Sequence, residues 1–424
     1  MSIIKRGGGI KMLIQFNFKN FKSFRDETIL DLSATKITEF SERVRTISQE
    51  KILPVAAIYG SNASGKSNVY QAFEYMSHYV VDSFMYGNEE KFSSIKPSPF
   101  LFDAESEQVD TSFEVYFTIP GDPTEKCYNY GFCVGPLGIT EEWLNRKAKT
   151  AKDYRTIFYR DCDSQDLSGL PKNCHKNIEV ALEKEVLIVS LGAKLKIEIC
   201  KIIRDWFYNN EFANFGDVVT NLLLARALPV GFVDSDEVRN NVVKFLSSFD
   251  KSIKGFEVIK LPPTDGKEEN RYSIQALHYK AGTKQMAKIP LSEESAGTLK
   301  MFAMYQLLQQ VLENGGVFFI DELNARLHPL LVRNVLITFL NPEINKHDAQ
   351  LIFTTHDTWQ LSNLLLRRDE IWFVNKDEEG VSSLYSLSDF KTEENMQIRK
   401  DESYEKNYLL GKYGAIPELQ NITF

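Results

Sequence analysis

The chain has 424 residues, a formal net charge of −8 and 43% hydrophobic residues. This length is too great for one simple core and predicts two or three structural units. The acidic balance argues against a uniformly basic nucleic-acid binder, although it leaves a local basic groove open, and no apolar run reaches the roughly 18–20 residues of a membrane helix.

The N-terminal residues carry basic side chains without an apolar stretch behind them, so we expect no signal peptide and no membrane association. The glycine run before Met12 is typical of a disordered leader, which leaves Met1 and Met12 as alternative starts. Five scattered cysteines without a C-x-x-C pair indicate neither a disulfide framework nor a zinc site, and they favour a cytoplasmic location.

Apolar and polar residues alternate at the start of the stretch 12–32. This pattern predicts an edge strand, a turn around residues 20–23 and a second strand that ends near Leu32.

The most specific motif follows in the stretch 55–73. It matches in full the phosphate-binding pattern G-x-x-x-x-G-K-S/T, with Gly60, Ser61, Asn62, Ala63, Ser64, Gly65, Lys66 and Ser67. The apolar run 55–59 predicts a buried strand, and the residues from Asn68 onward predict a helix to about Phe84.

Such a loop and the helix N-terminus after it direct backbone N–H groups at phosphate oxygens, so residues 60–68 are the expected nucleotide contacts. Lys66 would reach the β- and γ-phosphates, and the Ser67 hydroxyl would hold Mg²⁺. The sequence therefore predicts a nucleoside triphosphate site.

The next part of the chain predicts a polar loop over 86–99 and three strands at 112–118, 128–133 and 139–144. From about 146 to 250 period-two runs become rare, and helical spacing appears in 180–189, 195–207 and 238–249. We therefore expect a compact, mainly helical insertion at 146–250 between two parts of one nucleotide-binding unit, 12–145 and 251–424.

The last part returns to strands and then alternates strands with helices. The expected strands lie at 256–261, 272–279, 317–320, 350–354, 371–374 and 382–385, and the expected helices at 297–313 and 329–340.

Two carboxylates, Asp321 and Glu322, directly follow the apolar run 317–320. A buried strand delivers such acids to its carboxyl end, where ligands bind in open α/β sheets. Asp321 would hold Mg²⁺ and Glu322 would be the base that polarises the attacking water. Alone this pattern is weak, but downstream of a phosphate loop it is specific.

The segment 291–298 opens the predicted helix with the small residues Ser295, Ala296 and Gly297. Exposed backbone N–H groups there would form a second phosphate-binding surface. The alternative is an ordinary helix cap in which Ser295 only bonds the first turn.

His356 follows the strand 350–354 and would reach the γ-phosphate or Glu322, although a lone histidine at a strand end is more often structural. His328 lies near the same edge, and its role stays open. Arg367 and Arg368 are interpreted as solvated charge, with a docking surface as the alternative.

The motif order GSNASGKS, SEESAGT, VFFIDE with LHP, and TTHD resembles the ABC-type ATPases of the SMC, RecF and OLD-like group. It is most similar to the RloA- and AriA-type ATPases of bacterial phage-defence operons. The terminal segments NFKNFKSFRDETILDLSA, RRDEIWFVNKD and LLGKYGAIP also resemble that family, whereas 146–250 matches it loosely.

The resemblance implies an α/β ABC-type ATPase head, with a mixed sheet, flanking helices and an antiparallel β subdomain. It implies a head-to-head homodimer in which Ser295, Ala296 and Gly297 of one subunit cap ATP on the loop of the other. It makes Glu322 the catalytic base, His356 the switch histidine and residues 324–327 the D-loop. The Ser-Ala-Gly-Thr signature departs from the transporter pattern, and Gln108 is the best candidate for the Q-loop glutamine.

The first hypothesis for function is an ATPase whose nucleotide-dependent dimerisation controls a nuclease-like, TOPRIM-like or toxin partner in anti-phage defence. DNA or a phage protein is the expected trigger, and a higher assembly is left open. The second is an SMC- or RecF-like DNA-clamp or repair ATPase. A third, a nuclease in this chain itself, is disfavoured because few residues follow His356 and the only D-x-D, residues 161–163, lies in a polar loop.

Overall fold

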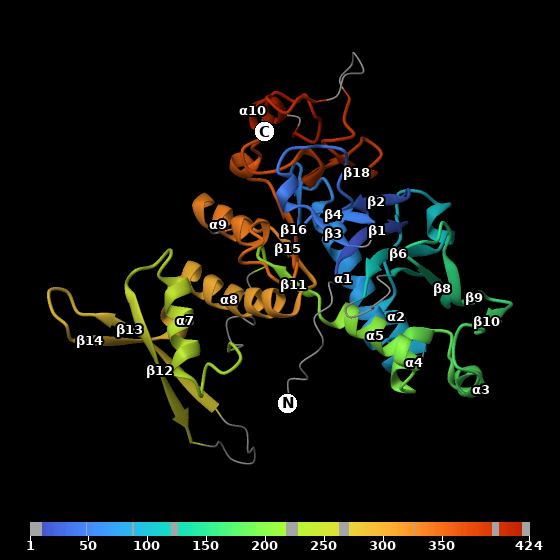
Figure 1. Cartoon of the computed structure of the whole chain (residues 1–424), viewed down its shortest axis with the longest axis horizontal. Helices are drawn as coiled ribbons and strands as arrows, with labels where there is room; N and C mark the ends of the chain where they lie inside the picture. Colours follow the sequence, from blue (N-terminus) through green and yellow to red (C-terminus); the bar gives the residue numbers. More distant parts are fainter. Residues whose placement is uncertain are drawn as a thin grey trace, which may run out of the picture.

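The computed structural model describes residues 11–47, 49–86, 89–119, 126–217, 228–262, 271–325, 327–391 and 398–417. Its centre is a six-stranded sheet in the order β11-β15-β16-β5-β17-β18 (Figure 1). Its strands are β5 (Val55–Tyr59), β11 (Glu211–Asn214), β15 (Val317–Asp321), β16 (Gln350–Thr355), β17 (Ile371–Lys376) and β18 (Ser382–Ser386).

All neighbours in this sheet are parallel except β18, which pairs antiparallel with β17 at one edge. β5 lies between β16 and β17, so a strand from the first part of the chain pairs with two from the last part. The parallel strands therefore present the carboxyl ends of β5, β15 and β16 at one edge of one sheet.

Helices cover both faces of this sheet, which explains why β5, β15 and β16 are buried along their whole length. Alternate residues such as Ile58 and Phe319 share a core with α1 (Lys66–Asp82). Their neighbours Ala57 and Phe318 share a second core with α8 (Ala296–Asn314) and α9 (Pro329–Leu340).

A seven-stranded antiparallel sheet, in the order β10-β9-β8-β7-β6-β1-β2, packs on the other side of α1. Its strands are β1 (Leu13–Lys19), β2 (Thr28–Asp31), β6 (Thr111–Thr118), β7 (Cys127–Gly135), β8 (Gly138–Lys147), β9 (Arg155–Arg160) and β10 (Gln165–Asp166). The predicted α/β class, with a mixed sheet, flanking helices and an antiparallel β part, is confirmed.

The expectation that the first strand lies at an edge is wrong. β1 pairs with β2 on one side and with β6 on the other, and β2 forms the edge. The partner β6 lies nearly one hundred residues further along the chain, so local alternation could not reveal it.

The expectation of a polar loop over 86–99 is also wrong, because α2 (Glu89–Ile95) lies within this range. This helix has only two apolar residues, Phe92 and Ile95, so it carries little of the helical period on which the prediction rested.

The described part of 146–250 contains mainly helices, as expected, but it also contributes strands to both large sheets. β8, β9 and β10 continue the antiparallel sheet, and β11 joins the central sheet beside β15. The helices of this region are α3 (Lys172–Ala181), α4 (Ile188–Lys194), α5 (Glu198–Tyr208) and α7 (Asp236–Leu246). The unit boundaries 12–145, 146–250 and 251–424 stay a prediction.

The helix expected over 180–189 is instead the break between α3 and α4, and a buried carboxylate fixes that break. Glu142 is fully buried and accepts hydrogen bonds from the N–H groups of Ile188 (2.7 Å) and Val189 (3.2 Å) at the start of α4. Arg160 Nε donates to the same side chain at 3.1 Å. α4 is thereby anchored to β8 and β9.

A three-stranded antiparallel sheet with α7 packed on it projects from the body at the left of Figure 1. It consists of β12 (Ile253–Leu261), β13 (Arg271–Tyr279) and β14 (Met286–Pro290). The hairpin of β3 (Arg45–Ile47) and β4 (Glu50–Ile52) precedes β5, and the short helix α10 (Tyr404–Leu409) follows β18. Among the described helices none is long and apolar enough to cross a membrane.

Candidate nucleotide-binding site

The phosphate loop leaves the carboxyl end of β5 and enters α1 at Lys66. Gly65 precedes this helix with φ 112°, a conformation that L side chains rarely adopt. A Cβ atom at Gly65 would lie 2.5 Å from Ser382 Oγ and 2.8 Å from Ser23 Oγ. The loop therefore needs glycine here for its turn and for the close approach of two serines.

These two serines form a tether behind the loop, which we call the serine tether and which comprises Ser23, Ser64, Asn68 and Ser382. Ser382 Oγ lies 2.6 Å from Ser64 O and 2.7 Å from Ser23 Oγ, and Asn68 Nδ2 donates to Ser23 Oγ at 2.7 Å. Ser382 N also donates to Ser23 O. The tether joins the β1–β2 turn, the loop and the edge strand β18.

Sequence reasoning missed Ser23 and Ser382. Neither belongs to a recognisable motif, and they are 359 residues apart. Their role follows only from the fold.

Lys66 closes the loop upon itself. Its Nζ donates to Gly60 O at 2.9 Å and to Ser61 O at 2.8 Å, and the side chain is 7% exposed. Burial lowers the pKa of Lys66, while Asp321 and Glu322 act to raise it. The lysine is therefore within electrostatic range of both carboxylates at the end of β15, as the motif order predicted.

Asp321 is 2% exposed and meets the loop through Ser67. Its carboxylate accepts hydrogen bonds from Thr354 Oγ1 at 2.6 Å and from the Ser67 hydroxyl. Burial raises the pKa of Asp321, and the two hydroxyl hydrogen bonds oppose this rise. Thr354 was not predicted to take part in the site.

The Ser67 and Asp321 pair fits the metal that such a site implies. Both offer oxygen ligands, they lie in mutual contact, and Asp321 is largely withdrawn from water. Mg²⁺ in nucleotide sites takes one or two protein oxygens and completes its shell with phosphates and water. When bound, it would neutralise phosphate charge beside Lys66.

Glu322 turns away from the strand with φ 54°, a left-handed conformation that costs a non-glycine residue about 1 kcal/mol. Its N–H donates to Thr354 Oγ1 at 2.9 Å, so one threonine holds the backbone of Glu322 and the side chain of Asp321. A Cβ atom built at Gly216 would lie 2.5 Å from Glu322 Oε2. The carboxylate therefore rests against a glycine that follows β11.

His356 is exposed after β16 and meets the predicted D-loop. Its Nε2 lies 3.2 Å from Asn324 Nδ2, and Asn324 Oδ1 accepts a hydrogen bond from Thr355 Oγ1 at 2.8 Å. Lys300 of α8 donates to Ala325 O and lies over the Phe215 ring, 4.1 Å from its centroid. The segment after Glu322 is thus connected both to His356 and to the helix that carries the signature residues.

The signature residues Ser295, Ala296 and Gly297 form the start of α8, and the first two are exposed. Ser295 Oγ accepts a hydrogen bond from Thr298 N at 3.1 Å, so it caps the helix. Among the hydrogen bonds and ion pairs of the described residues, none joins these residues to the phosphate loop. The structure thus brings together residues 60–68, 321–322 and 356 and leaves the signature outside this group.

The remaining candidates have other partners. Gln108 is exposed, and its backbone N–H donates to Glu105 O within a single helical turn. His328 Nδ1 accepts from Leu330 N at 3.3 Å and caps α9. Asp161, in the D-x-D sequence, accepts from the N–H groups of Asp163 and Ser164 in the β9–β10 turn.

The interpretation of Arg367 as solvated charge is wrong, because this residue is 1% exposed. Its guanidinium forms two hydrogen bonds with Asp369, at 2.9 and 2.8 Å, and donates to Glu39 O. Arg368 pairs with the Glu39 side chain at 2.9 Å. These arginines fasten the residues before β17 to the N-terminal part of the chain.

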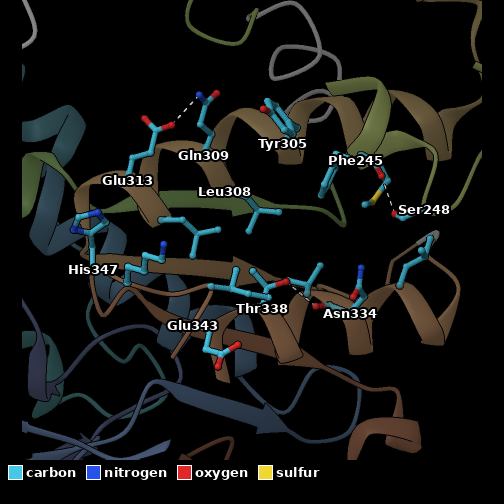
Figure 2. A pocket seen from close by; sticks show the side chains of 16 residues that line it. Phe245, Ser248, Tyr305, Leu308, Gln309, Glu313, Asn334, Thr338, Glu343 and His347 are labelled. Carbon is cyan, nitrogen blue, oxygen red and sulfur yellow. Dashed lines mark hydrogen bonds between the residues drawn. The ribbon is translucent and has the colours of Figure 1, made fainter. Parts of the chain in front are cut away.

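A cavity of about 520 Å³ lies away from this chemistry, between α8 and α9 (Figure 2). Figure 2 shows Leu308 of α8 and Thr338 of α9 facing each other across it. The residues that line it include none of the loop, carboxylate or signature residues. This cavity is therefore not the candidate nucleotide site, which the converging motif residues identify instead.

A family model described as "AAA domain, putative AbiEii toxin, Type IV TA system" matches residues 55–358, from β5 to just beyond His356. This range spans the loop, the carboxylates and the histidine that the fold brings together. The chain belongs to this family. The match confirms the P-loop ATPase assignment that the motifs indicated.

Heads of SMC proteins are among the solved structures that match the chain. The SmcHead bound to the C-winged helix domain of ScpA is 16% identical, with a TM-score of 0.42 and coverage of 91% of this chain and 99% of that chain. The SMC head domain from Thermotoga maritima is 18% identical, with a TM-score of 0.41 and coverage of 88% and 98%. No curated protein matches the chain.

Proposed function

We propose that this chain binds ATP with Mg²⁺, hydrolyses it to ADP and phosphate, and uses the bound nucleotide to hold two copies together. The observation that carries the proposal is the convergence of Lys66, Ser67, Asp321 and Glu322 at the carboxyl ends of β5 and β15.

Within one chain, each group has a task that its surroundings support. The N–H groups of residues 60–68 and the start of α1 would bind the phosphates. Lys66 would leave the carbonyl oxygens of Gly60 and Ser61 and move to the β- and γ-phosphates. Ser67 and Asp321 would hold Mg²⁺. Glu322 would accept a proton from the attacking water, and His356 would contact the γ-phosphate.

One chain would provide only half of the closed site. Ser295, Ala296 and Gly297 begin α8 with N–H groups at its exposed end, which suits a phosphate but not one on their own loop. In a head-to-head homodimer these residues of one copy would cap the ATP of the other.

We further propose that this dimerisation controls a nuclease-like or toxin effector in anti-phage defence, triggered by DNA or a phage protein. The family description, which names a putative toxin of a toxin–antitoxin system, supports a role in such a pair. The alternative is a DNA-clamp or repair ATPase that acts through binding alone. An adjacent effector gene whose toxicity requires intact Lys66 would favour the first of these functions.

The decisive test for the dimer is Glu322→Gln, which removes the base and keeps the shape of the side chain. With ATP and Mg²⁺ the variant should accumulate as a dimer in size-exclusion chromatography with light scattering. Glu343→Gln, an exposed glutamate outside the site, is the matched control and should not accumulate. A Glu322→Gln protein that binds ATP and stays monomeric would contradict the proposal.

A further inference from the structure

The projecting sheet β12–β14 carries a concentration of positive charge on an acidic protein. We call residues 251–262 and 271–290 the basic arm. Its described residues include a single acid, Glu257, and seven cations, all exposed: Lys251, Lys254, Lys260, Arg271, Lys280, Lys284 and Lys288.

The contrast with the rest of the chain is large. The whole stretch 251–290 contains eight Lys and Arg against four Asp and Glu, a formal charge of +4. Because the complete chain has −8, the other residues together carry −12. The arm is therefore a local positive region that projects from a negative body (Figure 1).

The described residues of the arm do not neutralise this charge among themselves. Lys288 pairs with Glu257 at 2.7 Å, and Lys254 lies 5.8 Å from the centroid of the Tyr279 ring. Within the described residues, the side chains of Lys251, Lys260, Lys280 and Lys284 make no hydrogen bond and no ion pair. These four ammonium groups are available to an external polyanion.

We propose that the basic arm binds the phosphate backbone of a nucleic acid. A regular array of phosphates attracts clustered lysines without requiring a fixed side-chain geometry, and counterion release supplies the affinity. An acidic protein is the less favoured partner, because lysine is depleted at protein–protein interfaces and arginine is enriched, and six of the seven cations are lysine.

The arm is also connected to the signature segment. His278 Nε2 of β13 lies 2.8 Å from Glu294 Oε1, and Glu294 directly precedes Ser295. Asp250, at the base of the arm, hydrogen-bonds with Thr298 of α8. A nucleic acid on the arm would therefore act on the residues that cap ATP, and this second step rests on the proposed function.

Binding is tested without nucleotide, so that its outcome does not depend on ATP chemistry. The full chain is titrated against a labelled duplex DNA and a single strand of equal length, with fluorescence anisotropy as the readout at several salt concentrations. The test variant combines Lys251→Gln, Lys260→Gln, Lys280→Gln and Lys284→Gln. The matched control combines Lys152→Gln, Lys172→Gln, Lys176→Gln and Lys201→Gln, four exposed lysines outside the arm.

The arm variant should bind at least about tenfold more weakly, and its slope of log K against log salt should be shallower by about 3 to 4, since each lost phosphate contact removes about 0.9. The control should bind as the unchanged protein does. If the arm variant loses thermal stability, Lys280→Glu with Lys284→Glu in the β13–β14 turn gives the same comparison.

Equal losses in both variants, or no binding of either DNA, would overturn the proposal. Arm-dependent binding of polyglutamate but not of DNA would assign the arm to an acidic protein instead, and would overturn it too. With DNA bound, ATP turnover should change in the unchanged protein but not in the arm variant. DNA binding without any ATP turnover would contradict the proposed function and leave the arm site standing.

Discussion

The phosphate loop and the signature segment differ in how this chain holds them. The loop is fixed from behind by the serine tether and internally by Lys66, and it meets Asp321 through Ser67. Of the signature residues, Ser295 and Ala296 are exposed, and the hydrogen bonds of Ser295 in the described structure lie within the start of its own helix. One half of the proposed site is preorganised, whereas the other is displayed outward.

This difference separates effects on binding from effects on assembly. Substitutions at the loop should act on a single chain, and substitutions at the signature should act only where two chains meet. Two variants test this distinction and a third tests the position of Glu322, in order from the largest expected effect to the smallest.

Lys66→Ala removes the cation that would contact the phosphates. A charge-assisted hydrogen bond contributes about 1.5–3 kcal/mol, so ATP affinity should fall by about one hundredfold and turnover should be lost. Isothermal titration calorimetry measures the affinity, and Lys176→Ala, an exposed lysine of α3, is the control. Unchanged ATP affinity would remove the basis of the proposed function.

Ser295→Arg places a bulky cation at the signature segment, at the start of α8. Binding of ATP to the single chain should stay within about twofold, since the signature lies outside the loop's own contacts. Turnover should fall by about ten- to one hundredfold, because the second copy could no longer close the site. ATP titration measures binding and a phosphate-release assay measures turnover. A loss of ATP affinity would show that the signature acts within one chain.

Gly216→Ala gives the smallest effect and tests the position of Glu322. The added methyl group meets a carboxylate at the end of a flexible side chain, so the protein should fold while the carboxylate moves. We expect kcat to fall by about tenfold with unchanged ATP affinity. A general base typically accelerates the reaction by about 10²–10⁴-fold, and a displaced Glu322 would lose only part of that acceleration. Gly255→Ala, in β12 of the basic arm, is the control, because its added methyl group would meet only the Leu277 side chain, at 3.3 Å. Equal kcat in the two variants would show that Gly216 does not position the base.

Much of the central sheet could be predicted because its strands are buried on both faces. Continuous apolar runs such as 55–59 and 317–320 are typical of buried strands, and they also predict where the motifs at their ends lie. β9 and β11 could not be predicted in this way, because β9 mixes charged and apolar residues and β11 has four residues. β11 becomes a strand only through pairing with β15, about one hundred residues later.

The candidate site divides in the same manner. Lys66, Asp321 and Glu322 belong to contiguous motifs whose chemistry is legible from residue type and spacing. Thr354 lies two residues before His356, at the end of β16. This position could have indicated that its hydroxyl reaches the carboxylates at the end of the neighbouring strand, where it bonds both Asp321 and Glu322. Gly216 had no such signal, because its contact with Glu322 depends on how two distant strands end at one edge.

The serine tether also has a consequence for synthesis of the protein. Ser382, which anchors the loop, is translated more than three hundred residues after Ser64. The phosphate-binding motif is therefore complete early on the ribosome, but the support behind it arrives only with β18. Until then a nascent chain holds an unsupported loop, and a prematurely ended chain lacks the support permanently. The tether would thus form only in molecules whose final strands have been made and folded.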